Sequence, residues 1–84
     1  MNREQKKQIV DFSKMVFDDK QHNKVEELLR AEKYNYLRMF ISDELEVLEI
    51  RSKIDTDNDD LNRDIRICSS MEDVVMDYCV SHAP

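Results

Sequence analysis

Residues 23–54 read NKVEELLRAEKYNYLRMFISDELEVLEIRSKI, and the predicted fold follows largely from this stretch. It contains neither glycine nor proline, and its apolar residues recur every three to four positions, which is the spacing of one face of an α-helix. Asn23, followed three residues later by Glu26, is typical of a helix N-cap with a capping box. The sequence therefore predicts one long central helix over about residues 23–54.

Such a helix would carry two apolar faces. The broader face consists of Val25, Leu28, Leu29, Tyr36, Met39, Phe40, Val47, Ile50 and Ile54. The second, at close to heptad spacing, consists of Tyr34, Leu37, Ile41, Leu45 and Leu48, with Arg38 beside it. A chain this short has little other surface with which to cover both faces. We therefore expect the second face to be an interface, and we expect the chain to self-associate, with a dimer favoured.

Two alternatives to that interface stay open. The helix could break near Ser42, which could cap a new helix, or the second face could belong to the core, covered by the flanking helices. Tyrosine and arginine are enriched at binding hot spots, which tilts the interpretation towards an interface.

Shorter helical patterns flank the central stretch. The spacing predicts a first helix over residues 3–19, a polar break over residues 18–23, and a turn over residues 55–60. Ser70 with Asp73 is typical of another capping box, which would open a last helix, and residues 82–84 are expected to fray. The fold class that follows is all-α, a small bundle of three to four helices forming a single domain over residues 1–84.

Glycine is absent from all 84 residues, and the only proline is Pro84. Phosphate-binding loops of the P-loop and dinucleotide types need glycine, as do most two-residue hairpin turns. These nucleotide sites are therefore excluded, and a compact many-stranded sheet is disfavoured. Because glycine is also the usual residue that ends a helix, its absence favours a central helix without an early stop.

The formal net charge is −6, from 13 basic and 19 acidic side chains. Residues 1–42 hold nine basic and seven acidic side chains, for a charge of +2, and residues 43–84 hold four and twelve, for −8. Acidic proteins are repelled by nucleic acid and by anionic lipid, so we expect neither as a partner. No apolar run is long enough to span a bilayer, so we expect no membrane insertion and a cytoplasmic location in the cell or a host cell. Cys68 and Cys79 are then expected to be reduced thiols.

Three possible ligand or catalytic sites can be drawn from the residues, and none has a complete signature. Asp55, Asp57 and Asp59 follow the spacing of a calcium-binding EF-hand, but Asp60 replaces the glycine of its sixth position and Arg66 the glutamate of its twelfth. Cys79 and His82 are half of a zinc site, for which Cys68 or His22 would have to supply the rest. A nucleophilic pair from the same residues lacks a recognisable oxyanion hole. We expect no bound metal, no cofactor and no enzymatic activity.

The charged residues raise two further hypotheses. The basic residues Arg3, Lys6, Lys7 and Lys14 could contact the phosphates of DNA. Acidic residues are interleaved with them, however, which indicates an ordinary charged helix face. The acidic set Glu46, Glu49, Asp57 and Asp59 could mimic nucleic acid and block a nucleic-acid-binding protein.

The sequence therefore favours a small non-enzymatic regulatory protein that acts by binding a larger protein partner. Short, acidic, helical chains without a catalytic signature are common among regulators encoded by phages and mobile elements, and the likeness is one of general character. The alternatives are the acidic mimic of nucleic acid and a small helical metal-binding protein.

Overall fold

The computed structural model describes residues 1–82 and confirms a small all-α bundle. It contains four helices, which are α1 (Arg3–Val16), α2 (Asp19–Arg30), α3 (Tyr34–Ile54) and α4 (Asp59–Ser81). The expected fraying of residues 83–84 lies outside the described residues, and His82 forms the C-cap of α4.

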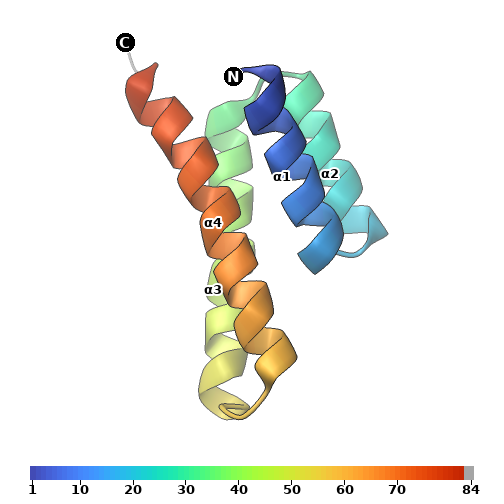
Figure 1. The fold of residues 1–84 in the computed structure, drawn as a ribbon, viewed down its shortest axis with the longest axis vertical. Helices are drawn as coiled ribbons and strands as arrows, with labels where there is room; N and C mark the ends of the chain where they lie inside the picture. The colour runs from blue at the N-terminus through green and yellow to red at the C-terminus, as the bar shows by residue number, and fades with distance from the viewer. Residues whose placement is uncertain (83–84) are drawn as a thin grey trace.

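The four helices form two antiparallel hairpins that pack side by side (Figure 1). α1 packs against α2 and α4, and α3 packs against α2 and α4, so each helix has two neighbours. α3 and α4 have 21 and 23 residues, whereas α1 and α2 have 14 and 12. At about 1.5 Å per residue, the second hairpin is therefore longer by roughly 10 to 17 Å. The surplus extends beyond the α1–α2 hairpin at the end where α3 joins α4 (Figure 1).

The core is one cluster to which all four helices contribute. Its buried members are Ile9, Val25, Leu28, Leu29, Leu37, Ile41, Leu45, Cys68, Met71 and Val75. Leu61 is also buried but lies outside this cluster, in the part of α4 near the α3–α4 turn. The extension is thus supported by contacts between α3 and α4, whereas the other half of the molecule is a bundle of four helices.

The first helix begins where the sequence predicts it, but the polar break after it is much shorter. Asn2 caps α1 through a capping box with Gln5, and Asp18 caps α2 through a second box with Gln21. Asn23, predicted to be an N-cap, lies inside α2 instead. Asp18 is favoured because its carboxylate accepts from the Gln21 N–H at 2.8 Å, while the Gln21 side chain bonds the Asp18 N–H in return.

The predicted continuous helix over residues 23–54 is wrong, because the chain turns between α2 and α3. Glu32 adopts a left-handed conformation, with φ of 57°. Its N–H bonds to the carbonyl of Leu29 at 3.1 Å, and the N–H of Lys33 bonds to the carbonyl of Leu28 at 3.0 Å. This pair of bonds is a Schellman motif, in which glycine is the usual left-handed residue. Glutamate takes that position here, so the absence of glycine did not prevent a stop.

Three further predictions concern helix breaks within the α3–α4 hairpin. α3 runs without interruption through Ser42, as the sequence favoured. A turn is present where it was predicted, but it covers only residues 55–58, because Asp59 and Asp60 form the first turn of α4. Asn58 caps α4 by accepting from the Leu61 N–H at 3.0 Å. The predicted helix start at Ser70 is wrong, because α4 is continuous there and the Ser70 hydroxyl donates to the Arg66 carbonyl one turn earlier.

Replacing Glu32 by glycine is expected to stabilise the protein by about 0.5–1 kcal/mol. A residue with a Cβ pays roughly 1–2 kcal/mol in the left-handed conformation, and the greater freedom of glycine in the unfolded chain offsets part of that gain. Urea unfolding followed by circular dichroism measures the difference. Glu32→Ala is the control, since it removes the carboxylate but keeps the Cβ, and equal stabilisation by both variants would contradict the assigned strain.

Candidate interaction surface

The apolar face that the sequence predicted as an interface lies mostly in the core. Leu37 and Ile41 are completely buried, and Leu45 retains 9% of its surface. Tyr34 and Leu48 are half-buried and pack against the same cluster. A side chain covered by its own chain cannot contact a partner, so the interface assigned to this face is replaced by the alternative in which it is core. Arg38, beside it, is half-buried.

The exposed apolar residues of α3 lie on the other side of the helix. We define the outer α3 face as Tyr36, Met39, Val47, Ile50 and Ile54, which are 64%, 58%, 46%, 52% and 85% exposed. At about 100° per residue these side chains point roughly 155° away from the buried line, so one helix carries a buried apolar side and an exposed one. Two apolar sides were predicted for the central stretch, but their roles were assigned the wrong way round.

The outer α3 face has two parts with different surroundings. Tyr36 and Met39 lie beside α2, in the half of α3 that the shorter hairpin accompanies. Val47, Ile50 and Ile54 lie in the C-terminal half, which extends past that hairpin (Figure 1). These three residues follow the i, i+3, i+7 spacing with which a helix presents anchors to a groove or to another helix. The distal part therefore has the geometry of a docking line.

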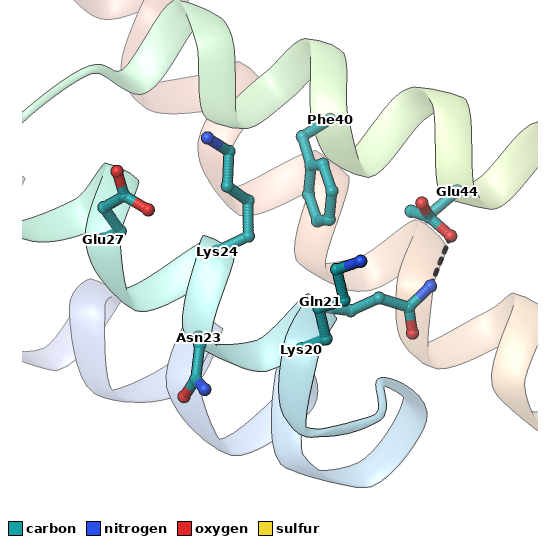
Figure 2. A pocket seen from close by; sticks show the side chains of 7 residues that line it. All are labelled: Lys20, Gln21, Asn23, Lys24, Glu27, Phe40 and Glu44. Atoms are coloured by element: carbon teal, nitrogen blue, oxygen red, sulfur yellow. Dashed lines mark hydrogen bonds between the residues drawn. The ribbon is translucent and has the colours of Figure 1, made fainter.

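A shallow groove separates α2 from the N-terminal half of α3. An open hollow of about 490 Å³ is lined there by Lys20, Gln21, Asn23, Lys24, Glu27, Phe40 and Glu44. Figure 2 shows the Phe40 ring lying between Lys24 and Gln21, with Gln21 donating to Glu44 at 2.7 Å. The lining charges of both signs surround a single aromatic ring, so the groove combines an apolar floor with a polar rim.

The four acidic residues that were predicted to mimic nucleic acid are all exposed. Glu46 and Glu49 lie on α3, Asp57 in the turn and Asp59 at the start of α4, at the extended end of the hairpin. Arg51 and Lys53 are exposed in the same region and interrupt the acidic surface. Nucleic-acid mimicry stays a prediction, with both kinds of charge present where it would act.

Three polar residues that the sequence did not link form a chain between α1 and α2. Ser13 Oγ lies 2.8 Å from His22 Nδ1, and His22 Nε2 contacts Glu26 Oε1. The neutral Nε2–H tautomer satisfies both contacts, because Ser13 then donates to Nδ1 and Nε2–H donates to the carboxylate. The order of groups is that of a catalytic triad, but Ser13 is completely buried inside a helix, so its hydroxyl has no access to a substrate. The arrangement instead satisfies a buried hydroxyl.

No periodicity in the sequence could have shown this contact. Ser13 and His22 lie on separate helices, nine positions apart, and meet because the α1–α2 turn brings the helices together. Only His22–Glu26, one turn apart on α2, has a spacing that sequence reasoning could have used.

Of the four residues considered for a metal site, three are held by other contacts, and Cys79 is half-buried against the core. Cys68 is buried with its Sγ 3.8 Å from the Ile41 carbonyl, and His22 is held by Ser13 and Glu26. His82 stacks on Tyr78 with 4.0 Å between ring centroids, while its Nδ1–H donates to the Tyr78 carbonyl at 2.9 Å. Within residues 1–82 no group of three or more His, Cys, Asp or Glu side chains could hold a metal ion, which includes the aspartates of the turn.

Burial makes Cys68 a poor nucleophile. Desolvation, followed by the negative charges of Glu72 and Glu44, raises the pKa of Cys68 to about 12. A thiol that keeps its proton at neutral pH neither attacks a substrate nor ligates a metal readily.

Comparison with known proteins adds no relative. No known protein family matches the chain, and neither a curated protein nor a solved structure is similar to it. Across the described residues, none of the helices combines the length and hydropathy that crossing a membrane requires.

Replacing His22 by alanine is expected to cost about 1–3 kcal/mol, because the buried Ser13 hydroxyl loses its partner. In the Ser13→Ala background the same change should cost less, since the hydroxyl is then absent, and a double-mutant cycle by urea unfolding measures the coupling. Glu26→Gln is the control and should change stability by less than about 0.5 kcal/mol, as its side chain is partly exposed. Strictly additive effects of the two alanine changes would contradict the role assigned to His22.

The Cys68 thiol is expected to make the protein less stable at high pH. Above pH 9.0, its ordinary pKa, the thiol ionises in the unfolded chain but keeps its proton in the folded one, up to about pH 12. The unfolded state then binds fewer protons, so this group lowers the free energy of unfolding by at most about 1.4 kcal/mol per pH unit. Urea unfolding from pH 8 to pH 11 on wild type and Cys68→Ala measures it, because the variant lacks this contribution to the slope. Identical slopes for the two proteins would contradict the prediction.

Proposed function

We propose that this protein is a small non-enzymatic binding protein that acts by docking on another polypeptide through the outer α3 face. The observation that carries the proposal is the exposure of Val47, Ile50 and Ile54 in one line on the part of α3 that the shorter hairpin leaves uncovered. Burying an aliphatic side chain of this size contributes about 1.5–3 kcal/mol, so a partner that covers the line gains appreciable binding energy.

The shape of the surface favours a helical partner. A convex helix with anchors at i, i+3 and i+7 is complementary to another helix or to an apolar groove. Charged side chains border the line on both edges, with Glu46 and Lys53 on one and Glu44 and Arg51 on the other. Asp43 is exposed on the outer α3 face itself, one turn before Val47. An apolar centre with a charged rim is the usual composition of a specific interface.

A non-enzymatic role is supported by the surroundings of the nucleophile candidates. Ser13 and Cys68 are completely buried, and the pKa of Cys68 is raised to about 12. The α2–α3 hollow is open and presents Phe40 among lysine, amide and carboxylate side chains, without a histidine or a cysteine in its lining. These features favour recognition over covalent chemistry as the activity of this chain.

The two sides of α3 are expected to respond differently to the same substitution. Ile41→Asp places an unpaired charge in the core and should cost more than about 4 kcal/mol, enough to unfold much of a domain this small. Ile50→Asp, on the outer α3 face, should change the free energy of unfolding by less than about 0.5 kcal/mol. Thermal unfolding by circular dichroism distinguishes them, and comparable destabilisation by both variants would contradict the assignment of the two sides.

Substitution of Ile50 also tests the proposed function. Wild type, Ile50→Asp and Ser42→Asp are immobilised and exposed to extract from the native host, and retained proteins are identified by mass spectrometry. Ser42→Asp is the matched control, because Ser42 is exposed on α3 but lies off the outer α3 face. We expect retained proteins, further copies of this chain included, to be held by wild type and Ser42→Asp and lost with Ile50→Asp. If Ile50→Asp retains the same proteins as wild type, the proposed binding surface is refuted.

A further inference from the structure

We propose that the occupant of the outer α3 face is a second copy of this chain, paired antiparallel along the C-terminal half of α3. The inference rests on the proposed function, since it uses the same surface, and it adds the identity of the partner and the register of the pairing. The order of charges beside the exposed line carries it.

The two edges of that line carry the same sequence of charges. Glu46 and Lys53 lie along one edge, and Glu44 and Arg51 lie along the other. In each pair the carboxylate precedes the cation by seven residues, which is two helical turns or about 10 Å. The C-terminal half of α3 is therefore acidic at its beginning and basic at its end, on both sides of Val47, Ile50 and Ile54.

An antiparallel copy reverses that order and brings opposite charges together. With Val47 of one chain against Ile50 of the other, the pairing is centred between residues 48 and 49. Glu46 then lies within about two residues, or 3 Å along the axis, of the second copy's Lys53. Glu44, whose carboxylate also accepts from Gln21 of its own α2, lies equally near the second copy's Arg51. Asp43, on the face itself, comes within about one residue of the second copy's Lys53 along the axis. Each contact occurs twice because the pairing is two-fold symmetric, so four ion pairs border the apolar centre.

Other pairings of the same surface lack this complementarity. A parallel pair would bring the two different edges together, so Glu46 would lie near the second copy's Glu44 and Lys53 near its Arg51. An antiparallel register that sets Tyr36 against Ile54 would cover more apolar surface, but it brings Glu44 and Glu46 close to their own copies. Like charges across an interface are unfavourable, so the charges select the register with Val47 against Ile50.

Charged residues outside the exposed line also favour the antiparallel arrangement. The extended end carries Asp57 and Asp59, and an antiparallel copy directs it towards the N-terminal half of the other α3. There Lys20, Lys24 and Lys33 line the two hollows between α2 and α3. The acidic turn of one chain thus faces the lysines beside α2 of the other.

The interface is short, which determines how the dimer should behave. It covers about three turns of one helix per chain, and this is less than the roughly 800 Å² per partner of a stable interface. The dimer is therefore expected to form and dissociate with protein concentration in the micromolar range and above.

A charge exchange tests both partner and register. Sedimentation equilibrium is run on the full chain as wild type, Glu46→Lys, Lys53→Glu, and an equimolar mixture of the two variants. Each variant alone should dissociate at least about tenfold more readily than wild type, because like charges then meet at residues 46 and 53. The mixture should recover a dimer, since two cations on one chain then face two carboxylates on the other at these positions. Glu49→Lys is the matched control: it makes the same charge change on the same helix, off the outer α3 face, and should dimerise as wild type does.

Each of the other outcomes refutes one of three claims: the second copy as partner, the register of the pairing, or the proposed function. A wild-type chain that stays monomeric at hundreds of micromolar refutes the second copy, while the proposed function survives if retention of a host protein depends on Ile50. The register is refuted if Glu46→Lys and Glu49→Lys weaken the dimer equally. It is also refuted if the mixture of Glu46→Lys and Lys53→Glu forms no more dimer than either variant alone. A dimer that Ile50→Asp leaves unchanged, with host-protein retention also unchanged, refutes the proposed function itself.

Discussion

The reversal of the chain at Glu32 sets the arrangement of all four helices. Two backbone hydrogen bonds, from Glu32 to Leu29 and from Lys33 to Leu28, close the end of α2 and turn the chain back. Because of this reversal, α2 lies against α3 and does not extend it, so the apolar residues of both helices meet in one core. The left-handed conformation of Glu32 costs energy, and the burial of Val25, Leu28 and Leu29 offsets that cost.

The same turn determines which side of α3 is buried. In an uninterrupted helix, Val25 and Leu29 would share one face with Tyr36, Val47 and Ile54. The turn removes that relation, because three non-helical residues rotate the direction of side chains in the second helix relative to the first. α3 then packs with its other apolar side inward, and the residues that continued the face of α2 become exposed. The surplus apolar surface foreseen on the central stretch is therefore present, on the opposite side of the helix.

The unequal lengths of the hairpins connect the fold to function. Where all four helices pack together, the interior holds the apolar cluster and the hydrogen bond between Ser13 and His22. Beyond the shorter hairpin only α3 and α4 face each other, so the outer side of α3 has no neighbour of its own (Figure 1). Val47, Ile50 and Ile54, the acidic turn, and the cations Arg51 and Lys53 lie in that extension, which is why binding is proposed there.

Local spacing and composition were enough to predict the all-α class, the start of the first helix, the continuity of α3 through Ser42, a turn directly after Ile54, and an excess of apolar surface on one helix. These features depend on interactions that act over a few residues. The packing of the helices was needed to show that Asp18 caps α2, that Leu37 and Ile41 are buried while Ile50 is exposed, and that Ser13 meets His22. The physical reason is that a left-handed Glu32 is unfavourable locally and persists because packing between distant helices compensates for it. A pattern along the chain does not contain that compensation.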